Sequence, residues 1–327
     1  MKVLLTGANG FVGSHILDCL RARGIATVLL LRPTSNKRFI ESHLPHVELR
    51  LGSVTDPKSV LQAMQDVTHV IHCAGCTKAL RVEEFYAVNQ AGTRHVVEAV
   101  NQQQGRIERL VHLSSLAAGG PALPSQPARE DDPPRPVSEY GKSKLAGEAE
   151  VQQGCQADFV MLRPPGVYGP RDAEFLRLFK AAKAHLRPRF GGGRQALSLV
   201  FVKDLAAAVL TCLTHPAAVR RLFYVASPEV VTVRALGDAI ASRLNVWTLP
   251  LRLPTAALWP VCCVQEAISR LTGRAHVLSR QKYAELRAPG WVCDPTRLRQ
   301  ELGFTCATSL KQGLAETLGW YQQEGWL

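Results

Sequence analysis

The chain has 327 residues, of which 46% are hydrophobic and only 6% aromatic. This composition excludes a disordered or fibrous chain and fits a globular α/β enzyme with room for a core domain and a substrate lobe. The formal net charge of +12 suits an anionic substrate group or a membrane surface, with a solvated basic surface as the alternative, but no motif predicts a nucleic-acid partner.

Strand and helix signals alternate along the first half of the chain, which predicts a parallel sheet. Short apolar runs predict strands at 2–6, 26–31, 47–51, 69–73, 109–114 and 157–163. Apolar residues at helical spacing predict helices at 11–23, 88–100 and 140–152. Asp56 followed by Pro57 predicts the start of one more helix, and a Pro-rich loop spans 119–136.

The second half is less regular, with helices predicted at 204–214, 233–244 and 309–326 and a strand at 221–226. The predicted fold is therefore α/β, a Rossmann-type doubly wound parallel sheet with a smaller, mostly C-terminal substrate-binding lobe. We expect the dinucleotide-binding domain to occupy residues 1–165 and the substrate-binding lobe to occupy 166–327. A segment near 198–226 is expected to return to the core sheet.

A glycine-rich turn joins the first predicted strand to the first predicted helix. Gly7 permits a tight turn, Gly10 allows backbone to approach a phosphate, and Gly13 lets the helix pack close to the sheet. Phe11 and Val12 lie in the first turn of that helix, whose N–H groups and positive dipole end attract a pyrophosphate. In this strand-turn-helix context, the pattern predicts a bound dinucleotide.

The end of the second predicted strand bears on the choice between NAD and NADP. An NAD-binding unit usually places an acid there, to bind the 2′-hydroxyl of the ribose. This chain instead has Leu31 and Arg32, followed by Ser35, Lys37 and Arg38. Because an arginine accommodates a 2′-phosphate, NADP is the expected cofactor. NAD is the alternative if Arg32 only lies on a solvated loop.

Three residues form the predicted catalytic group. Tyr140 and Lys144 are four apart and share one helical face, and Ser115 follows the fifth strand at the carboxyl edge where open α/β sheets bind ligands. A tyrosine with a pKa of about 10 exchanges protons poorly at neutral pH, and a nearby ammonium group lowers that pKa. The predicted chemistry is therefore general acid/base catalysis by Tyr140.

The chain resembles the extended short-chain dehydrogenases/reductases, also called the NAD-dependent epimerase/dehydratase family, over nearly its whole length. Its pattern is closest to the branch of 3β-hydroxysteroid dehydrogenases and dihydroflavonol reductases. Six segments in order carry the resemblance: TGANGFVG at 6–13, HCAG at 72–75, VNQAGT at 88–93, SS at 114–115, YGKSK at 140–144 and RPPGVYGP at 163–170.

The resemblance implies a role for each matching residue. Tyr140 would be the general acid/base, Ser115 would hydrogen-bond the reacting substrate oxygen, and Lys144 would bind the nicotinamide ribose. The residues that would line the cofactor path or flank the nicotinamide are Ala74, Gly75, Pro164 and Val167. Asn89 would either support the strands near the cofactor or cap a helix.

One departure from the family pattern concerns the adenine end of the cofactor. The family often carries an acid directly after the glycine that ends the third strand, whereas this chain has Ser53 after Gly52. Adenine recognition would then rest on Ser53 and on the backbone of Val54. Asp56 is expected to cap a helix and not to bind the cofactor.

The favoured reaction is hydride transfer between nicotinamide and a ketone or alcohol of an apolar small molecule. The alternatives are a nucleotide-sugar epimerase and a non-catalytic cofactor-binding protein on the same fold. Sugar-nucleotide epimerases often carry Asn where this chain has Gly166, and Arg-Asp-Phe where it has 198–200. Dehydratases carry Asp-Glu where this chain has Leu116 and Ala117. Arg194 remains a candidate phosphate ligand, which keeps the epimerase open.

The apolar, Pro-punctuated segment 249–268 could cap an apolar substrate, lie on a membrane surface, or form ordinary core. Expected substrate neighbours are Thr77, Lys78, Phe175 and Phe179. No secretory signal or transmembrane span is expected. Nine scattered cysteines, including the pair Cys73 and Cys76, predict a reducing cytoplasm with no disulfide framework and no metal site. The resemblance also leaves a homodimer open.

Overall fold

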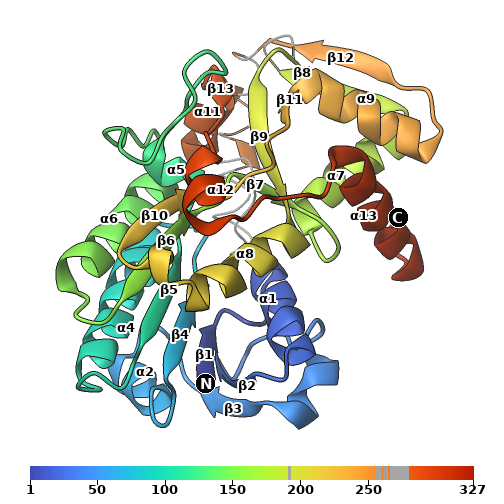
Figure 1. Cartoon of the computed structure of the whole chain (residues 1–327). Helices are drawn as coiled ribbons and strands as arrows, with labels where there is room; N and C mark the ends of the chain where they lie inside the picture. The colour runs from blue at the N-terminus through green and yellow to red at the C-terminus, as the bar shows by residue number, and fades with distance from the viewer. Residues whose placement is uncertain (191–192, 255, 257–258, 261, 263, 266–279) are drawn as a thin grey trace.

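The computed structural model describes residues 1–190, 193–254, 256, 259–260, 262, 264–265 and 280–327. Its core is a parallel seven-stranded sheet with the strand order β10-β6-β5-β4-β1-β2-β3 (Figure 1). These strands are β1 (Lys2–Thr6), β2 (Ala26–Leu31), β3 (Glu48–Leu51), β4 (His69–His72), β5 (Arg109–Leu113), β6 (Phe159–Arg163) and β10 (Arg221–Tyr224). All six strand pairings in this sheet are parallel.

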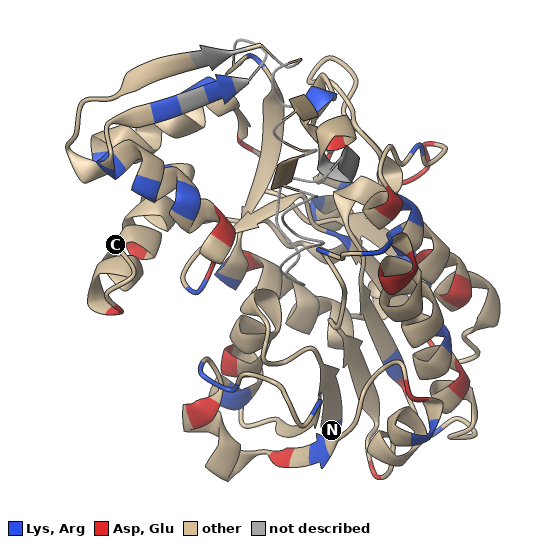
Figure 2. Ribbon diagram, turned by 180° about the vertical axis from the view of Figure 1, so that it is seen from behind, with Lys and Arg blue, Asp and Glu red and all other residues tan. Residues whose placement is uncertain are grey.

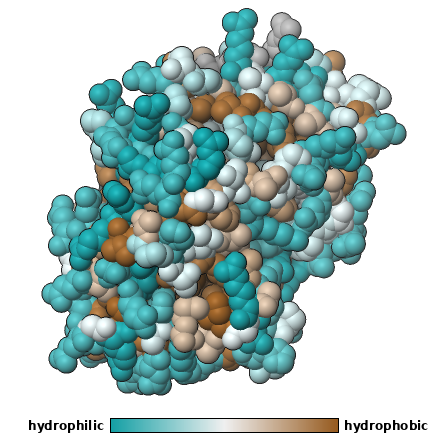
Figure 3. Space-filling view, viewed as in Figure 1, coloured by the Kyte–Doolittle hydropathy of each residue, from teal (hydrophilic) through white to brown (hydrophobic). Residues whose placement is uncertain are grey.

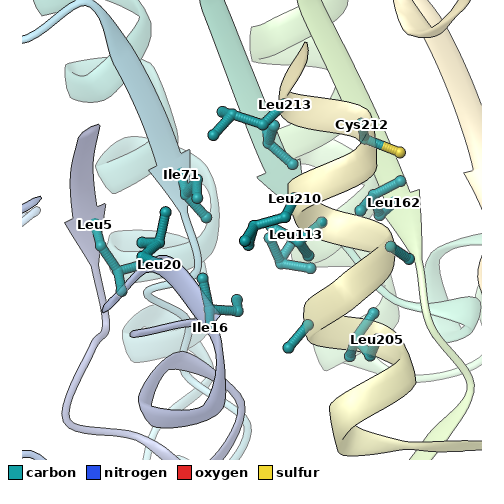
Figure 4. Packing of buried hydrophobic residues seen from close by; sticks show 14 of the residues in the cluster. Leu5, Ile16, Leu20, Ile71, Leu113, Leu162, Leu205, Leu210, Cys212 and Leu213 are labelled. Atoms are coloured by element: carbon teal, nitrogen blue, oxygen red, sulfur yellow. The ribbon is translucent and has the colours of Figure 1, made fainter. Parts of the chain in front are cut away.

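Helices cover both faces of this sheet. Helices α1 (Phe11–Ala22) and α8 (Val202–Thr214) pack on one face, where Ile16 and Leu205 join a large apolar cluster (Figure 4). The opposite face is covered by α2 (Pro57–Ala63), α4 (Gly92–Asn101) and α6 (Glu139–Gly154). Successive strand residues point to opposite faces, so both faces of β1 are apolar and buried.

The strand order reverses at β1, which lies between β2 and β4. The chain leaves this point in two directions, and doubly wound folds bind ligands at the carboxyl ends of the strands beside such a reversal, here β1 and β4. The predicted α/β fold with a doubly wound parallel sheet is confirmed.

A second lobe lies beyond the carboxyl edge of the core sheet (Figure 1). Its four-stranded sheet contains β7 (Gly166–Tyr168), β9 (Ala196–Phe201), β11 (Val230–Thr232) and β13 (Gly290–Trp291). A separate pair consists of β8 (Leu186–Phe190) and β12 (Leu249–Leu253). The lobe's apolar cluster includes residues of α7 (Ala173–Lys183), α9 (Val233–Leu244) and α13 (Leu310–Gln323). Within 198–226, α8 and β10 lie with the core sheet and β9 with the lobe.

Several short elements were not predicted. They are α3 (Val82–Tyr86), α5 (Leu116–Gly119), α11 (Arg280–Arg287), α12 (Thr296–Leu302), the 3₁₀ turns Glu41–His46 and Pro216–Ala218, and the strands β7, β8, β11, β12 and β13. The longer elements α7 and β9 were not predicted either. The helix predicted at 88–100 in fact begins with α3 and passes through a π-helical turn, Ala87–Ala91, into α4. Within the part of the chain described, no helix combines the length and apolarity needed to cross a membrane. The eight cysteines described there are free thiols.

A buried ion pair joins α6 to the end of β6. Two guanidinium nitrogens of Arg163 lie 2.8 and 2.6 Å from the carboxylate oxygens of Glu148, and both side chains are about 95% buried. Glu148 also accepts a hydrogen bond from Ser114, and Arg163 donates to the hydroxyl of Tyr224 at 3.1 Å. The network thus fixes α6 against β5, β6 and β10.

Removing the charge of Glu148 should destabilise the fold. In Glu148→Gln, the buried guanidinium of Arg163 would lose its counter-charge, which typically costs about 3–5 kcal/mol. Denaturant unfolding at neutral pH measures this loss. The matched control is Glu150→Gln on the same helix, because Glu150 pairs with Arg94 at the surface, where ion pairs contribute little. Equal stability of the two variants would contradict the role given to the buried pair.

Candidate active site

Two glycines of the turn after β1, Gly7 and Gly13, lie too close to neighbouring backbone for any other residue. A Cβ on Gly7, whose φ is +72°, would lie 2.7 Å from the backbone nitrogen of Ala74. A Cβ on Gly13 would lie 2.1 Å from the carbonyl oxygen of Gly7. Helix α1 begins after Gly10 with no capping side chain and no acid in its first turn. Its first amides, at Phe11 and beyond, therefore offer a site for an anion.

The basic residues after β2 divide into two groups. Arg32 is exposed and makes no ion pair with any residue the structure describes. Arg38, in contrast, lies 3.0 Å from Glu324 and stacks 5.3 Å from the ring centre of Trp326. Of the two arginines predicted near a 2′-phosphate, Arg38 therefore binds the C-terminal segment instead. Arg32 is the one that could still bind the phosphate.

The segment after β3 is held by local hydrogen bonds. The backbone N–H of Ser53 donates to Ser59 at 3.0 Å, and the carbonyl of Val54 lies 2.9 Å from a ring nitrogen of His95. Asp56 accepts a hydrogen bond from the first turn of α2, so the prediction that it caps this helix is confirmed. Ser53 and Val54 thus lie in a fixed segment at the carboxyl end of β3.

Helix α6 carries Tyr140 and Lys144 toward the carboxyl end of β5. Ser138 caps the helix by accepting a hydrogen bond from the backbone of Gly141 at 3.1 Å. One turn further, the ammonium group of Lys144 donates to the carbonyl of Leu113 at 2.5 Å. Lys144 is only 4% exposed, and this burial lowers its pKa to about 8.

Ser115 lies beside Tyr140 at the same edge. Burial raises the pKa of Tyr140 to about 12, and a hydrogen bond with Ser115 opposes this rise. The hydroxyl of Ser115 also caps α5 by accepting from Ala117 at 3.1 Å. The structure therefore brings Ser115, Tyr140 and Lys144 together.

Residues from the neighbouring strand ends border this group. A Cβ on Gly75 would lie 3.9 Å from the ammonium nitrogen of Lys144, so the loop after β4 passes directly over it. Ala74 donates its backbone N–H to the hydroxyl of Thr6 at 3.1 Å. The carbonyl of buried Pro164 accepts from Leu116 at 2.8 Å. Val167 follows on β7 and is partly buried.

Asn89 connects the loop after β4 to the catalytic helix. Its side chain accepts from the N–H of Cys76 at 2.8 Å and donates to the carbonyl of the same residue at 2.9 Å. It also donates to Ser143 on α6 at 2.9 Å. The structure thus favours a supporting role for Asn89 over helix capping. Its place in a π-helical turn is typical of functional sites.

Two buried histidines under the site were missed by the sequence analysis. The ring nitrogens of His72 lie 2.8 Å from the hydroxyl of Thr6 and 3.1 Å from that of Thr93. The ring of His112 lies 5.4 Å from that of His72. Burial and the charge of Lys144 lower the pKa of His72 to about 3 and that of His112 well below its usual value. The signal was present: both histidines interrupt apolar strands at positions facing α6.

The residues expected to lie near the substrate differ in their exposure and contacts. Thr77 and Lys78 are exposed, and Lys78 pairs with Glu174. Phe175 stacks on Tyr168 and is partly exposed.

Phe179 is fully buried in the lobe's core, 5.3 Å from the ring of Tyr321, so its predicted contact with substrate is wrong. Of the apolar segment 249–268, residues 255, 257–258, 261, 263 and 266–268 lie outside the described part of the chain.

Known proteins resemble this chain over most of its length. Residues 3–226 match the model of the NAD dependent epimerase/dehydratase family. A ceramide reductase from Caulobacter vibrioides is 29% identical over 327 residues, which cover 99% of this chain and 96% of that protein. A 4-hydroxy-2-methyl-3-oxo-4-farnesyl-3,4-dihydroquinoline-1-oxide ketoreductase from Stigmatella aurantiaca is 25% identical, with 96% and 95% covered.

Among solved structures, the UDP-glucose 4-epimerase of Thermus thermophilus in complex with NAD aligns with a TM-score of 0.78 and 24% identity. The alignment covers 98% of this chain and 99% of that one. At this identity, the similarity establishes a shared fold.

The buried ammonium of Lys144 should make stability depend on pH. Its pKa is about 8 in the folded chain and 10.5 when unperturbed, so between these values the unfolded state binds more protons. As the pH is raised from about 8 to 10.5, the free energy of unfolding of the wild type should therefore increase relative to that of Lys144→Met, by about 3 kcal/mol in total. Denaturant unfolding across this range measures the difference.

The matched control is Lys142→Met, because Lys142 is half-exposed and pairs with Glu139 at the surface of the same helix. Its difference from wild type should stay constant over this pH range. A constant difference for Lys144→Met as well would show that the Lys144 ammonium is not strained by burial.

Proposed function

The chain belongs to the NAD-dependent epimerase/dehydratase family, and from this premise we propose that it is a nicotinamide-dependent oxidoreductase acting on a ketone or alcohol of an apolar small molecule. The observation that carries the proposal is the convergence of Ser115, Tyr140 and buried Lys144 at the carboxyl edge of the core sheet. The reductases among its relatives support the same chemistry. Residues 1–165 would hold the cofactor, and 166–327 would hold the substrate.

The residues present fit a dinucleotide. The turn between Gly7 and Gly13 leaves the amides at the start of α1 uncapped, and a pyrophosphate is an anion of the right charge for them. Ser53 and Val54 would face the adenine, and Arg32 would bind a 2′-phosphate, so NADP is favoured over NAD. Gly75, Pro164 and Val167 would border the nicotinamide. The nicotinamide, when bound, supplies or accepts the hydride.

Residues of the chain would transfer the proton that accompanies the hydride. In the direction of reduction, the hydroxyl of Tyr140 would donate its proton to the substrate oxygen, and in oxidation the phenolate would take it back. Ser115 would hold that oxygen by a hydrogen bond. The charge of the buried Lys144 ammonium would favour the phenolate form of Tyr140 against the effect of burial, which raises the pKa of that tyrosine.

A steric contact favours an apolar substrate over a nucleotide sugar. Gly166 on β7 is the register partner of Leu199 on β9. A Cβ at position 166 would lie only 2.9 Å from a methyl group of Leu199, which is 5% exposed. An Asn at 166, as in many sugar-nucleotide epimerases, would therefore need Leu199 to move. With glycine at 166, the Leu199 side chain keeps its place in the apolar cluster of the lobe.

Removing the hydroxyl of Tyr140 should abolish most turnover. A general acid/base typically contributes a factor of about 10²–10⁴, so Tyr140→Phe should lower kcat by at least about a hundredfold. The measurement is oxidation of NADPH and NADH with a panel of ketones that includes long-chain and polycyclic compounds. Tyr86→Phe is the matched control, because the hydroxyl of Tyr86 bonds Glu139 outside the proposed site.

Unchanged turnover in Tyr140→Phe would refute the role of Tyr140 as general acid/base. Binding of UDP-glucose, measured by calorimetry, would favour the epimerase as the function.

Removing the guanidinium of Arg32 should weaken NADPH selectively. A hydrogen bond to a charged group contributes about 1.5–3 kcal/mol, so Arg32→Ala should raise the Kd for NADPH by about tenfold or more. The Kd for NADH should change little. Arg38→Ala is the control, because Arg38 pairs with Glu324. An equal loss of affinity for both cofactors in Arg32→Ala would contradict the preference for NADP.

A further inference from the structure

Two neighbouring helix-to-strand connections form one end of the second lobe. Helix α7 passes into β8 at 184–185, and α9 passes into β12 at 245–248. The backbone N–H of Leu249 donates to the carbonyl of His185 at 2.8 Å and joins the two connections. This end lies where α9 turns into β12, at the right of Figure 1. We call it the lobe tip, defined by Lys183, His185, Leu186, Arg243, Trp247 and Leu249.

The lobe tip exposes three large apolar side chains. Leu186 is 42% exposed, Leu249 is 55% exposed and Trp247 is 71% exposed. Leu186 and Leu249 are register partners on β8 and β12, so they share one face of this two-stranded sheet. The next residue, Arg187, points to the other face, where it pairs with Asp238 of α9. The face turned away from α9 is therefore apolar at the lobe tip.

Trp247 is fixed in its exposed position. Its ring stacks on that of His185 with centroids 4.3 Å apart and an angle of 18° between planes. A ring nitrogen of His185 also lies 2.8 Å from the carbonyl of Trp247. The stack holds the indole in place, so little order is lost when its other face meets a partner. Tryptophan is enriched at membrane–water interfaces, where its amphipathic ring suits the headgroup level.

The elements that meet at the lobe tip are strongly basic. In sequence, α7, β8, α9 and β12 contain eight Lys and Arg but only two Asp and Glu. Lys183 and Arg243 lie in the last turns of α7 and α9 and are exposed beside the apolar residues. Figure 2 shows Lys and Arg predominating on this lobe, and Figure 3 shows apolar patches among hydrophilic ones on its surface.

The positive charge of the lobe tip distinguishes two possible partners, a second copy of the chain and an anionic lipid surface. A second copy of the chain would bring the same positive charge to the contact and repel the first. An anionic lipid surface attracts Lys183 and Arg243 and accepts Trp247 and both leucines at its headgroup boundary. We propose that the lobe tip docks the protein onto an anionic membrane surface, where an apolar substrate would also be dissolved.

The proposal does not require hydride transfer, so it stands or falls separately from the proposed function. Tyr140→Phe should bind vesicles as wild type does, even when it turns over no substrate. The test is co-sedimentation of the full chain with phosphatidylcholine vesicles that contain phosphatidylglycerol, and with vesicles of phosphatidylcholine alone. Wild type should bind the anionic vesicles at least tenfold more strongly, and added salt should weaken that binding.

Two pairs of variants separate the contributions. Trp247→Ala combined with Leu249→Ser should weaken binding to anionic vesicles at least tenfold, whereas Leu123→Ser, at an exposed leucine elsewhere, should not. Lys183→Glu should weaken it more than Lys58→Glu, which changes an exposed lysine on α2. Thermal unfolding checks that each variant is folded.

Three results would overturn the proposal. The first is failure of the wild type to bind anionic vesicles. The second is equal binding by the tip variants and their controls. The third is a concentration-dependent dimer in sedimentation velocity that disappears in the Trp247 and Leu249 double variant, which would make the lobe tip a contact between copies.

Discussion

The ion pair between Glu148 and Arg163 is the constraint on which the candidate site depends. Helix α6 presents Tyr140 and Lys144 from its first two turns, and a rotation of this helix would move both side chains away from Ser115. Apolar packing alone resists rotation weakly because it is not directional. The bidentate geometry of the buried pair, with distances of 2.8 and 2.6 Å, fixes one orientation of α6 against β6. Ser114 and Tyr224 extend the restraint to the two strands on either side of β6.

This rigid support allows the site to hold an ammonium group where it is unfavourable. Lys144 is buried beside His72 and His112, whose low pKa values keep them uncharged, so neither histidine adds a positive charge beside it. Its Leu113 hydrogen bond compensates only part of the lost hydration. The consequence is a lysine whose pKa of about 8 lies close to neutral pH.

The sequence predicted the features that depend on local pattern. The glycine turn, the core strands, the cap at Asp56 and the shared helical face of Tyr140 and Lys144 all follow from residues close in the chain. Pairings between residues far apart in the chain cannot be predicted in this way. The sequence around Glu148 is that of an ordinary helix, and the sequence around Arg38 contains no sign of its contact with Glu324. Phe179 was misjudged for the same reason, since its place in the helix says nothing of the buried Tyr321 opposite. Strands β8 and β12 escaped prediction because prolines and arginines interrupt their apolar pattern.

The lobe proposed to hold the substrate contains a further pairing of this long-range kind. Two departures from the sugar-nucleotide pattern, at Gly166 and Leu199, look independent in sequence but are one steric unit across β7 and β9. A Cβ at 166 would displace the end of the Leu199 side chain, so the residues at these two positions depend on each other. The lobe that carries this apolar contact also exposes Trp247 on a basic surface. An amphipathic lobe tip fits the apolar substrate proposed above, because such a substrate would partition into lipid.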